Sequence, residues 1–297
     1  MIGKGAPPCN SCAWFAATPQ RLTKPLSRLT ENGRQKYDPG KAIAWRLFQG
    51  NLWERDVKLS NFKVLTFDCY GTLIDWESGM VAALSALTER LQPALTRNEI
   101  LEAHGRIEAM QQLATPAKPY AELLAVVYKR LAEHWGLAVS WQECLTYGRS
   151  IADWPAFPDS AEALRYLKQH FAIVILSNVD NESFAHSNAR LGVAFDAVYT
   201  AADIGSYKPA ARNFEYMLAD LGARGVERSD ILHVAESLFH DHVPASDFGL
   251  TSCWIHRRHG DEGFGATRPP ETMPKIDFRF ENMAALAAAH QAETARD

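Results

Sequence analysis

Short apolar runs alternate with helical segments along most of this 297-residue chain, and the runs end in polar residues. The run AIVILSN at residues 172–178 is apolar almost throughout, as expected for a strand covered on both faces of a parallel sheet. Further runs of strand length lie at residues 63–67, 197–201, 230–236 and 251–256. This alternation is typical of an α/β fold with a doubly wound, Rossmann-like parallel sheet.

The alternation is interrupted directly after the first run. Residues 78–154 carry apolar side chains at helical spacing, and Pro155 then ends the pattern. We therefore expect a helical cap domain, residues 78–154, inserted after the first strand. Residues 62–77 and 155–297 are expected to form the sheet-containing core.

The first 61 residues differ from the rest in charge. Residues 1–60 hold ten Lys/Arg and four Asp/Glu, whereas the remaining residues hold 21 and 31. We expect residues 1–61 to be a basic, disordered N-terminal extension, and an organellar transit peptide is the alternative. Cys9 and Cys12 form a CxxC pair there, but no second pair follows to complete a zinc site.

The overall composition excludes several classes of protein. With 47% hydrophobic and 22% charged residues, the chain is not of the disordered or fibrous type. A net charge of −4 gives no bulk basic surface for nucleic acid, and no apolar run reaches the roughly 18 residues of a membrane span. Five scattered cysteines indicate a reducing compartment, so we expect a cytoplasmic protein.

Polar side chains stand at or just after the ends of the predicted strands. Because ligands bind at the carboxyl ends of strands in open parallel sheets, we expect these residues to form one site. They are Asp68, Ser177, Asn178, Lys208, Glu236 and Asp241. The Asp68 carboxylate has the chemistry of a nucleophile that forms a covalent ester. Thr72 is placed to hydrogen-bond that nucleophile, and Lys208 supplies a positive charge that keeps it ionised.

Four segments carry a resemblance to a known family. DCYGTLIDW at 68–76, LSN at 176–178, SYKP at 206–209 and AESLFHD at 235–241 resemble the four ordered motifs of the haloacid dehalogenase-like superfamily. The resemblance covers about residues 62–260 and includes a helical cap at the expected place. It implies a hydrolase with an aspartate nucleophile, with Asp68, Thr72, Lys208 and Asp241 as catalytic residues.

The residue two positions after the nucleophile indicates the reaction. Phosphatases of this superfamily carry a second Asp there as general acid, whereas this chain has Tyr70. A phenol with a pKa of about 10 is a poor acid near pH 7, and a halide leaving group needs no proton. Tyr70 therefore looks like the type II 2-haloacid dehalogenases. That resemblance implies cofactor-free hydrolysis of (S)-2-haloacids through an aspartyl ester.

The same resemblance implies how the substrate is bound. We expect Tyr70, Ser177 and Asn178 to contact a small anionic substrate. Arg106, early in the cap, is the expected cradle for the halide, and Asp241 is expected to position the water that cleaves the ester.

Glu236 keeps a second enzyme class open. Together with Asp68 and Asp241 it restores the paired acids of magnesium-dependent phosphatases, and carboxylate oxygens suit a hard cation. The alternative function is thus a Mg²⁺-dependent phosphatase acting on a small phosphomonoester. A non-catalytic binding module is a third hypothesis, against which intact Asp68, Thr72 and Lys208 argue. A homodimer is a further expectation that no sequence feature decides.

Overall fold

The computed structural model describes residues 57–296, so the CxxC pair and nearly all of the predicted extension lie outside the described residues. Within this range the chain forms a six-stranded sheet in the order β3-β2-β1-β4-β5-β6, and every neighbouring pair is parallel. The strands are β1 (Val64–Phe67), β2 (Ala172–Ser177), β3 (Ala197–Thr200), β4 (Ile231–Ala235), β5 (Thr251–Ile255) and β6 (Phe278–Phe280). The predicted doubly wound sheet is confirmed, with β6 as a strand that the sequence pattern missed.

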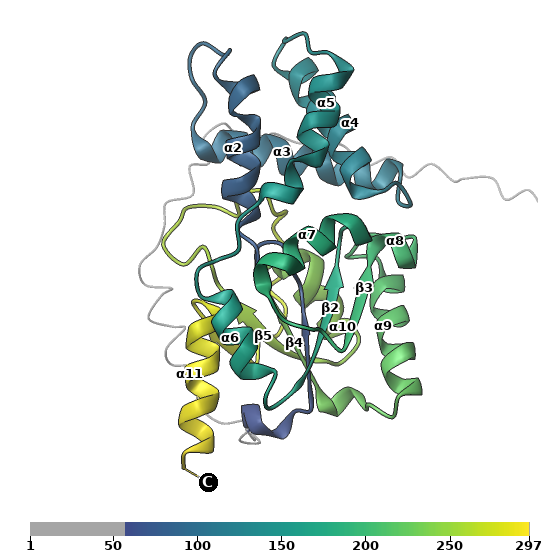
Figure 1. Ribbon diagram of the computed structural model, residues 1–297, viewed down its shortest axis with the longest axis vertical. Coiled ribbons are helices and arrows are strands. Elements are labelled where there is room, and N and C mark those ends of the chain that lie inside the picture. Colours follow the sequence, from purple (N-terminus) through teal and green to yellow (C-terminus); the bar gives the residue numbers. More distant parts are fainter. Residues whose placement is uncertain (1–56, 297) are drawn as a thin grey trace, which may run out of the picture. The chain divides into compact units, whose positions relative to one another are not determined.

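Helices cover both faces of the sheet. Figure 1 shows α6 (Ser160–Leu167) and α11 (Met283–Thr294) on one face and α9 (Ala211–Ala223) on the other. The remaining core elements are α7 (Asn181–Leu191), α8 (Ala201–Ile204), α10 (Val243–Asp247), the π-helix η4 (Leu238–His242) and the short 3-10 helices η1 (Leu59–Asn61) and η3 (Arg228–Asp230). No helix between residues 57 and 296 is long and apolar enough to cross a membrane.

Alternation along each strand divides the core between the two faces. Leu65 and Phe67 of β1 join the larger buried cluster, which includes side chains of α6 and α11. Val64 joins the smaller cluster under α9 and α10. The central strands β1, β2 and β4 contribute apolar side chains to both clusters, which explains the continuous apolar runs in the sequence.

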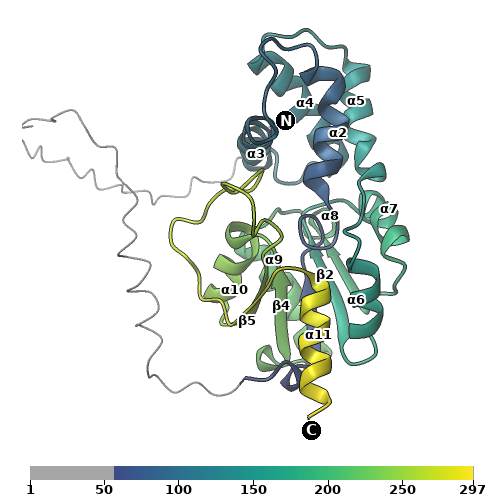
Figure 2. The same cartoon turned by 90° about the vertical axis from the view of Figure 1, so that its left-hand side faces the viewer.

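Four helices form the insertion after β1: α2 (Trp76–Thr88), α3 (Arg97–Ala114), α4 (Tyr120–His134) and α5 (Trp141–Arg149), followed by the 3-10 helix η2 (Ser150–Asp153). Figure 2 shows this helical insertion beyond one end of the sheet. Capping boxes begin α3 at Thr96 and α5 at Ser140, each with a Glu three residues later. The sequence pattern thus specifies where these helices start.

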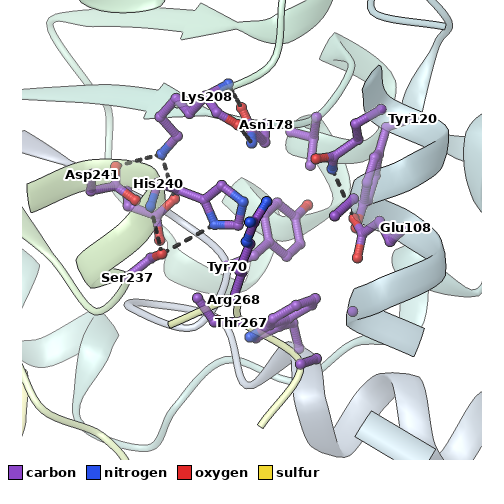
Figure 3. Close-up of a pocket in the computed structure, with 17 residues that line it drawn as sticks. Tyr70, Glu108, Tyr120, Asn178, Lys208, Ser237, His240, Asp241, Thr267 and Arg268 are labelled. Carbon is purple, nitrogen blue, oxygen red and sulfur yellow. Dashed lines mark hydrogen bonds and ion pairs between the residues drawn. The ribbon is translucent and has the colours of Figure 1, made fainter. Parts of the chain in front are cut away.

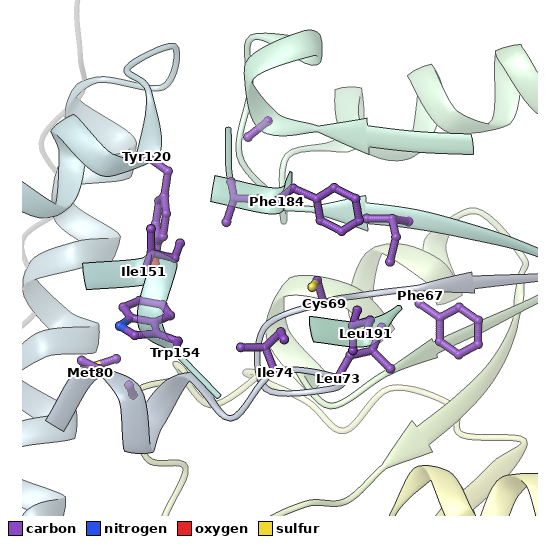
Figure 4. Close-up of a cluster of buried hydrophobic side chains, with 14 of the residues drawn as sticks. Phe67, Cys69, Leu73, Ile74, Met80, Tyr120, Ile151, Trp154, Phe184 and Leu191 are labelled. Atoms are coloured by element: carbon purple, nitrogen blue, oxygen red, sulfur yellow. The ribbon is translucent and has the colours of Figure 1, made fainter. Parts of the chain in front are cut away.

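The insertion shares one apolar cluster with the sheet (Figure 4). Trp154, where the chain leaves the insertion, is 1% exposed, and Met80 and Ile151 belong to the same cluster as Phe67 of β1. Within that cluster Tyr70 and Trp154 pack edge to face, with ring centroids 5.8 Å apart. Because this packing reaches the residues next to Asp68, the insertion helps to position the strand end.

At the opposite end of the sheet, η1 precedes the predicted core boundary at residue 62. Glu293 of α11 accepts hydrogen bonds from the backbone N–H groups of Leu59 and Ser60 at 2.9 and 3.0 Å. Leu59 is also buried in the larger cluster. The described core thus includes residues that the sequence pattern assigned to the extension.

Gly148 tests how closely the helices of the insertion pack. A Cβ at Gly148 would lie 2.2 Å from the carbonyl oxygen of Ala121, so α5 and α4 cannot accept it without moving. We expect Gly148→Ala to lower the free energy of unfolding by about 1–3 kcal/mol, as overpacking does. Helix propensity alone would raise it by about 1 kcal/mol.

Gly222 of α9 provides the matched control, because a Cβ there would meet nothing within 4 Å. Gly222→Ala should leave the stability unchanged or raise it by up to about 1 kcal/mol. Urea unfolding of both variants measures these changes in the free energy of unfolding. Equal stabilisation of the two would show that α4 and α5 pack less tightly than described.

Candidate active site

The strand ends bring one lysine and two aspartates together. Lys208 Nζ donates to Asp68 Oδ1 at 2.9 Å, to Asp241 Oδ1 at 2.6 Å and to the backbone carbonyl of Leu176 at 2.8 Å. These three bonds use all the donors of an ammonium group. Asp68 follows β1, Lys208 follows α8, and Asp241 lies in η4 after β4, so the contact joins three separate segments (Figure 3).

The three charges set one another's protonation. Burial alone would lower the pKa of Lys208, but Asp241 and Asp68 outweigh it and raise that pKa. Burial likewise opposes ionisation of Asp241, yet Lys208 and His233 hold the pKa of Asp241 well below its usual range. The pKa of Asp68 is raised, because burial and the nearby Asp241 charge outweigh Lys208. Asp68 is therefore the carboxylate that takes up a proton first.

Thr72 holds the second oxygen of Asp68. Its Oγ1 donates to Asp68 Oδ2 at 2.8 Å and accepts a hydrogen bond from the backbone N–H of Glu236 at 2.9 Å. The turn that carries Thr72 depends on Gly71, whose φ of 92° lies in the region that favours glycine. Both oxygens of Asp68 are thus oriented.

Arg257 binds the backbone of this turn. The sequence analysis did not identify it. Its Nε and a terminal nitrogen donate to the Thr72 carbonyl at 3.1 and 2.8 Å, and its other terminal nitrogen pairs with Asp159 at 2.8 Å. The guanidinium also lies 4.0 Å from the centre of the Phe157 ring. The available signal was a pair of arginines directly after the predicted strand at residues 251–256.

Asn178 lines the pocket, whereas Ser177 is not among the residues that line it. The Asn178 side chain makes two reciprocal hydrogen bonds with the Lys208 backbone, accepting at 2.6 Å and donating at 3.0 Å. It lines the pocket, but its amide positions the lysine. Ser177 is 2% exposed, and its Oγ has no hydrogen-bond partner among the described residues.

A cavity of about 60 Å³ opens beside this cluster. Tyr70 lines it, and its hydroxyl lies 2.7 Å from Ser187 Oγ and 3.3 Å from the Ser183 carbonyl, both in α7. Burial raises the pKa of Tyr70 well above its usual range, so the phenol is a still weaker acid than in water. Aromatic side chains of Trp76 and Tyr120 complete the apolar part of the wall.

The structure does not bring Arg106 into this pocket. Helix α3 presents Gly105, Glu108, Ala109 and Gln112 to the cavity, a spacing of one helical face. Arg106 lies off that face, is exposed, and contacts His134 at 3.3 Å. The cation that lines the pocket besides Lys208 is Arg268, in the loop between β5 and β6. No motif singled it out in the sequence.

Glu236 is also placed apart from the predicted acid cluster. Its side chain lines a second cavity of about 150 Å³, together with Glu77 and Arg258. Burial, Glu77 and Asp68 raise the pKa of Glu236 to about 8, so this carboxyl is mostly protonated at neutral pH.

The predicted Mg²⁺ ligands Asp68, Glu236 and Asp241 are therefore not assembled into a metal site. Within residues 57–296, no three His, Cys, Asp or Glu side chains are grouped so as to hold a metal ion. Lys208 Nζ lies within hydrogen-bond distance of both aspartates and neutralises them in part. The donor set fits an internal ammonium better than a divalent cation.

The buried lysine is expected to carry much of the stability of the strand ends. Lys208→Met would leave two buried carboxylates without their counter-ion, so we expect the free energy of unfolding at pH 7 to fall by about 3–5 kcal/mol. Lys168→Met is the matched control, since Lys168 pairs with Asp196 at the surface and such pairs contribute about 0–1 kcal/mol. Chemical unfolding measures both, and similar small losses would contradict the described pairing.

The comparisons with known proteins agree with this geometry. A family model of haloacid dehalogenase-like hydrolases matches residues 62–238. An (S)-2-haloacid dehalogenase of Pseudomonas putida is 27% identical over 212 residues, which are 68% of this chain and 88% of that protein. The (S)-2-haloacid dehalogenase 4A of Burkholderia cepacia is 26% identical over 208 residues, with 67% and 85% covered.

A solved structure shows the same fold. The L-2-haloacid dehalogenase of Xanthobacter autotrophicus with covalently bound chloropropionic acid aligns with a TM-score of 0.64 and 19% identity, over 77% of this chain and 98% of that one. The family model extends from just before β1 into η4 and spans more than half of the chain. The chain therefore belongs to the haloacid dehalogenase-like hydrolases.

Proposed function

We propose that this protein is an (S)-2-haloacid dehalogenase, which converts a small 2-haloacid and water into a 2-hydroxyacid, a halide ion and a proton. The observation that carries the proposal is the oriented Asp68 carboxylate beside a cavity with Tyr70 on its wall. The Tyr70 hydroxyl is hydrogen-bonded to α7 and provides no acid for an oxygen leaving group. The curated relatives named (S)-2-haloacid dehalogenases support the same reaction.

In the first step an oxygen of Asp68 attacks C2 of the substrate. The carbon–halogen bond breaks, the halide leaves with the bonding electron pair, and an aspartyl ester forms without proton transfer. Thr72 and Lys208 fix the carboxylate in one orientation, which favours in-line attack. Arg268 makes no ion pair with the described residues and lines the pocket, so we assign it to the anionic groups of the substrate.

In the second step water cleaves the ester. Asp241 Oδ1 is bound by Lys208 and His233, whereas its buried Oδ2 has no hydrogen-bond partner among the described residues. We assign Oδ2 as the acceptor that orients the water toward the carbonyl carbon of the Asp68 ester. Attack breaks the bond between the carbonyl carbon of Asp68 and the ester oxygen, which leaves as the hydroxyl of the 2-hydroxyacid with one proton of the water. The other proton passes through Asp241 to solvent, and Asp68 is regenerated as a carboxylate.

We propose that neither step uses a metal or cofactor from the surroundings. The magnesium-dependent phosphatase alternative rested on Glu236 as a third acid beside Asp68 and Asp241. The side chain of Glu236 lines the second cavity instead, with a pKa raised to about 8. No observation in the described residues favours the phosphatase over the dehalogenase.

Halide release tests the function directly. With EDTA present, we expect release of chloride from (S)-2-chloropropionate and far less from the R enantiomer. Asp68→Asn should lose activity by at least about 10⁴-fold, because an amide does not form the ester. Asp203→Asn, at an exposed position of α8, is the matched control and should keep the activity.

Two other results would contradict the proposal. Magnesium-dependent cleavage of p-nitrophenyl phosphate without any halide release would establish the phosphatase instead. Halide release that survives Asp68→Asn would assign the nucleophile to another residue.

The raised pKa of Asp68 predicts the acidic limb of the pH profile. Only the ionised carboxylate attacks, so kcat/KM should fall as the pH is lowered through an apparent pKa above 3.8. Thr72→Val removes a hydrogen bond to the ionised form and should move this limb to higher pH. Initial rates between pH 4 and 8 at constant ionic strength measure it. A limb unmoved by Thr72→Val would show that another group titrates.

A further inference from the structure

A second carboxylate, Glu108 of α3, faces the pocket from the helical insertion. It is 7% exposed, and its Oε1 accepts hydrogen bonds from Tyr120 Oη at 2.8 Å and from Gln112 Nε2 at 3.0 Å. Figure 3 shows Glu108 and Tyr120 across the pocket from Lys208 and Asp241. The catalytic steps proposed above use none of these insertion residues.

Glu108 is held in its ionised form although it is buried. Burial opposes ionisation, but hydrogen bonding and charge from His104 together with the Tyr120 hydroxyl outweigh it and lower the pKa of Glu108. His104 Nε2 lies 2.8 Å from Tyr147 Oη, which fixes the imidazole ring. The insertion therefore presents a rigid, negatively charged group to the cavity.

One oxygen of Glu108 is left with spare acceptor capacity. Its Oε2 lies 3.4 Å from His104 Nδ1, at ion-pair distance, whereas Tyr120 and Gln112 both donate to the other oxygen, Oε1. A bound substrate that covers this carboxylate removes water from it, which is costly unless the substrate itself supplies a donor. A donor on the bound substrate would meet this requirement.

The charges that line the pocket also favour a substrate with a hydrogen-bond donor. The charged side chains that line it are the carboxylates Asp68, Glu108 and Asp241 and the cations Lys208 and Arg268. Lys208 is shared by two of the carboxylates. A 2-haloacid with an alkyl tail would bring one more negative charge and cover Glu108 with a group that donates nothing.

We propose that Glu108 binds a hydrogen-bond donor of the substrate, so that the preferred substrates are 2-haloacids bearing a hydroxyl or ammonium group on C3. This inference rests on the proposed dehalogenase function. In this arrangement the carboxylate end of the substrate lies toward the cations and the polar tail lies toward α3. Gln112 and Tyr120 orient Glu108 and act as positioning residues.

Three substrates of nearly equal size test the inference: 2-chlorobutanoate, 2-chloro-3-hydroxypropanoate and 3-amino-2-chloropropanoate, each as the resolved enantiomer. They differ only in whether CH₃, OH or NH₃⁺ is bonded to C3. We expect at least one donor-bearing substrate to have a kcat/KM about 10- to 100-fold above that of 2-chlorobutanoate, as expected for a hydrogen bond to a charged group. The comparison of hydroxyl with ammonium shows which donor Glu108 selects.

Two variants locate the preference. Glu108→Leu should reduce the ratio of donor to alkyl substrate by at least about 10-fold. Glu108→Gln keeps the size of the side chain and should reduce the ratio for the ammonium substrate more than that for the hydroxyl substrate. Glu122→Gln alters an exposed carboxylate of α4 outside the pocket and should leave both ratios as they are.

The failures are distinguishable. If the wild-type protein releases halide from all three substrates without preferring a donor, or if Glu108→Gln leaves the ratios unchanged, the inference is wrong and the dehalogenase function stands. Absence of halide release from every substrate would overturn the proposed function. If Glu108→Leu does not fold, the ratios of kcat/KM measured for the wild-type protein still test the inference.

Discussion

The ammonium of Lys208, buried between two aspartates, is the interaction on which the rest of the site depends. Its three hydrogen bonds connect the ends of β1 and β2 with η4. Buried charges of this kind are stable only when each is paired, so the three segments are constrained to meet. The same contact gives Asp241 a low pKa and leaves Asp68 as the weaker acid of the two. This one interaction thus holds the strand ends together. It also gives the two aspartates different pKa values and therefore different roles.

Around this contact, the side chains of Asn178 and Arg257 fix the backbone. Asn178 holds the Lys208 backbone through both amide atoms, and Arg257 holds the Thr72 carbonyl through two N–H groups. Each anchor belongs to a segment far along the chain from the residue it holds. The nucleophile is therefore oriented by the sheet as a whole, which suits a reaction that requires in-line approach.

The sequence predicted the parts of this arrangement that follow from local pattern. Strand order brings the carboxyl ends of parallel strands to one edge, so the proximity of Asp68, Lys208 and Asp241 could be predicted once the strands were found. Arg268 could not, because it lies in the loop between β5 and β6, where Ala266 packs against Gly105 of the insertion. Arg106 was a wrong expectation for a related reason: its position one residue off the pocket-facing stripe of α3 is visible only when the helix is docked.

Glu236 belongs to a motif that was identified in the sequence, but its position there left two reactions open. In sequence it is five residues from Asp241, which indicates a pair of acids. In three dimensions its backbone N–H is bound by Thr72, while its carboxyl lies near Gly71 in the second cavity with Glu77 and Arg258. Its backbone thus supports the nucleophile turn and its side chain is withdrawn from the reacting pocket. Glu108 of the insertion, and not Glu236, adds a further negative charge to the pocket, at the end remote from Lys208. In the arrangement proposed above, the reacting groups Asp68, Lys208 and Asp241 follow the strands of the core, and the insertion supplies Glu108, the group that selects among substrates.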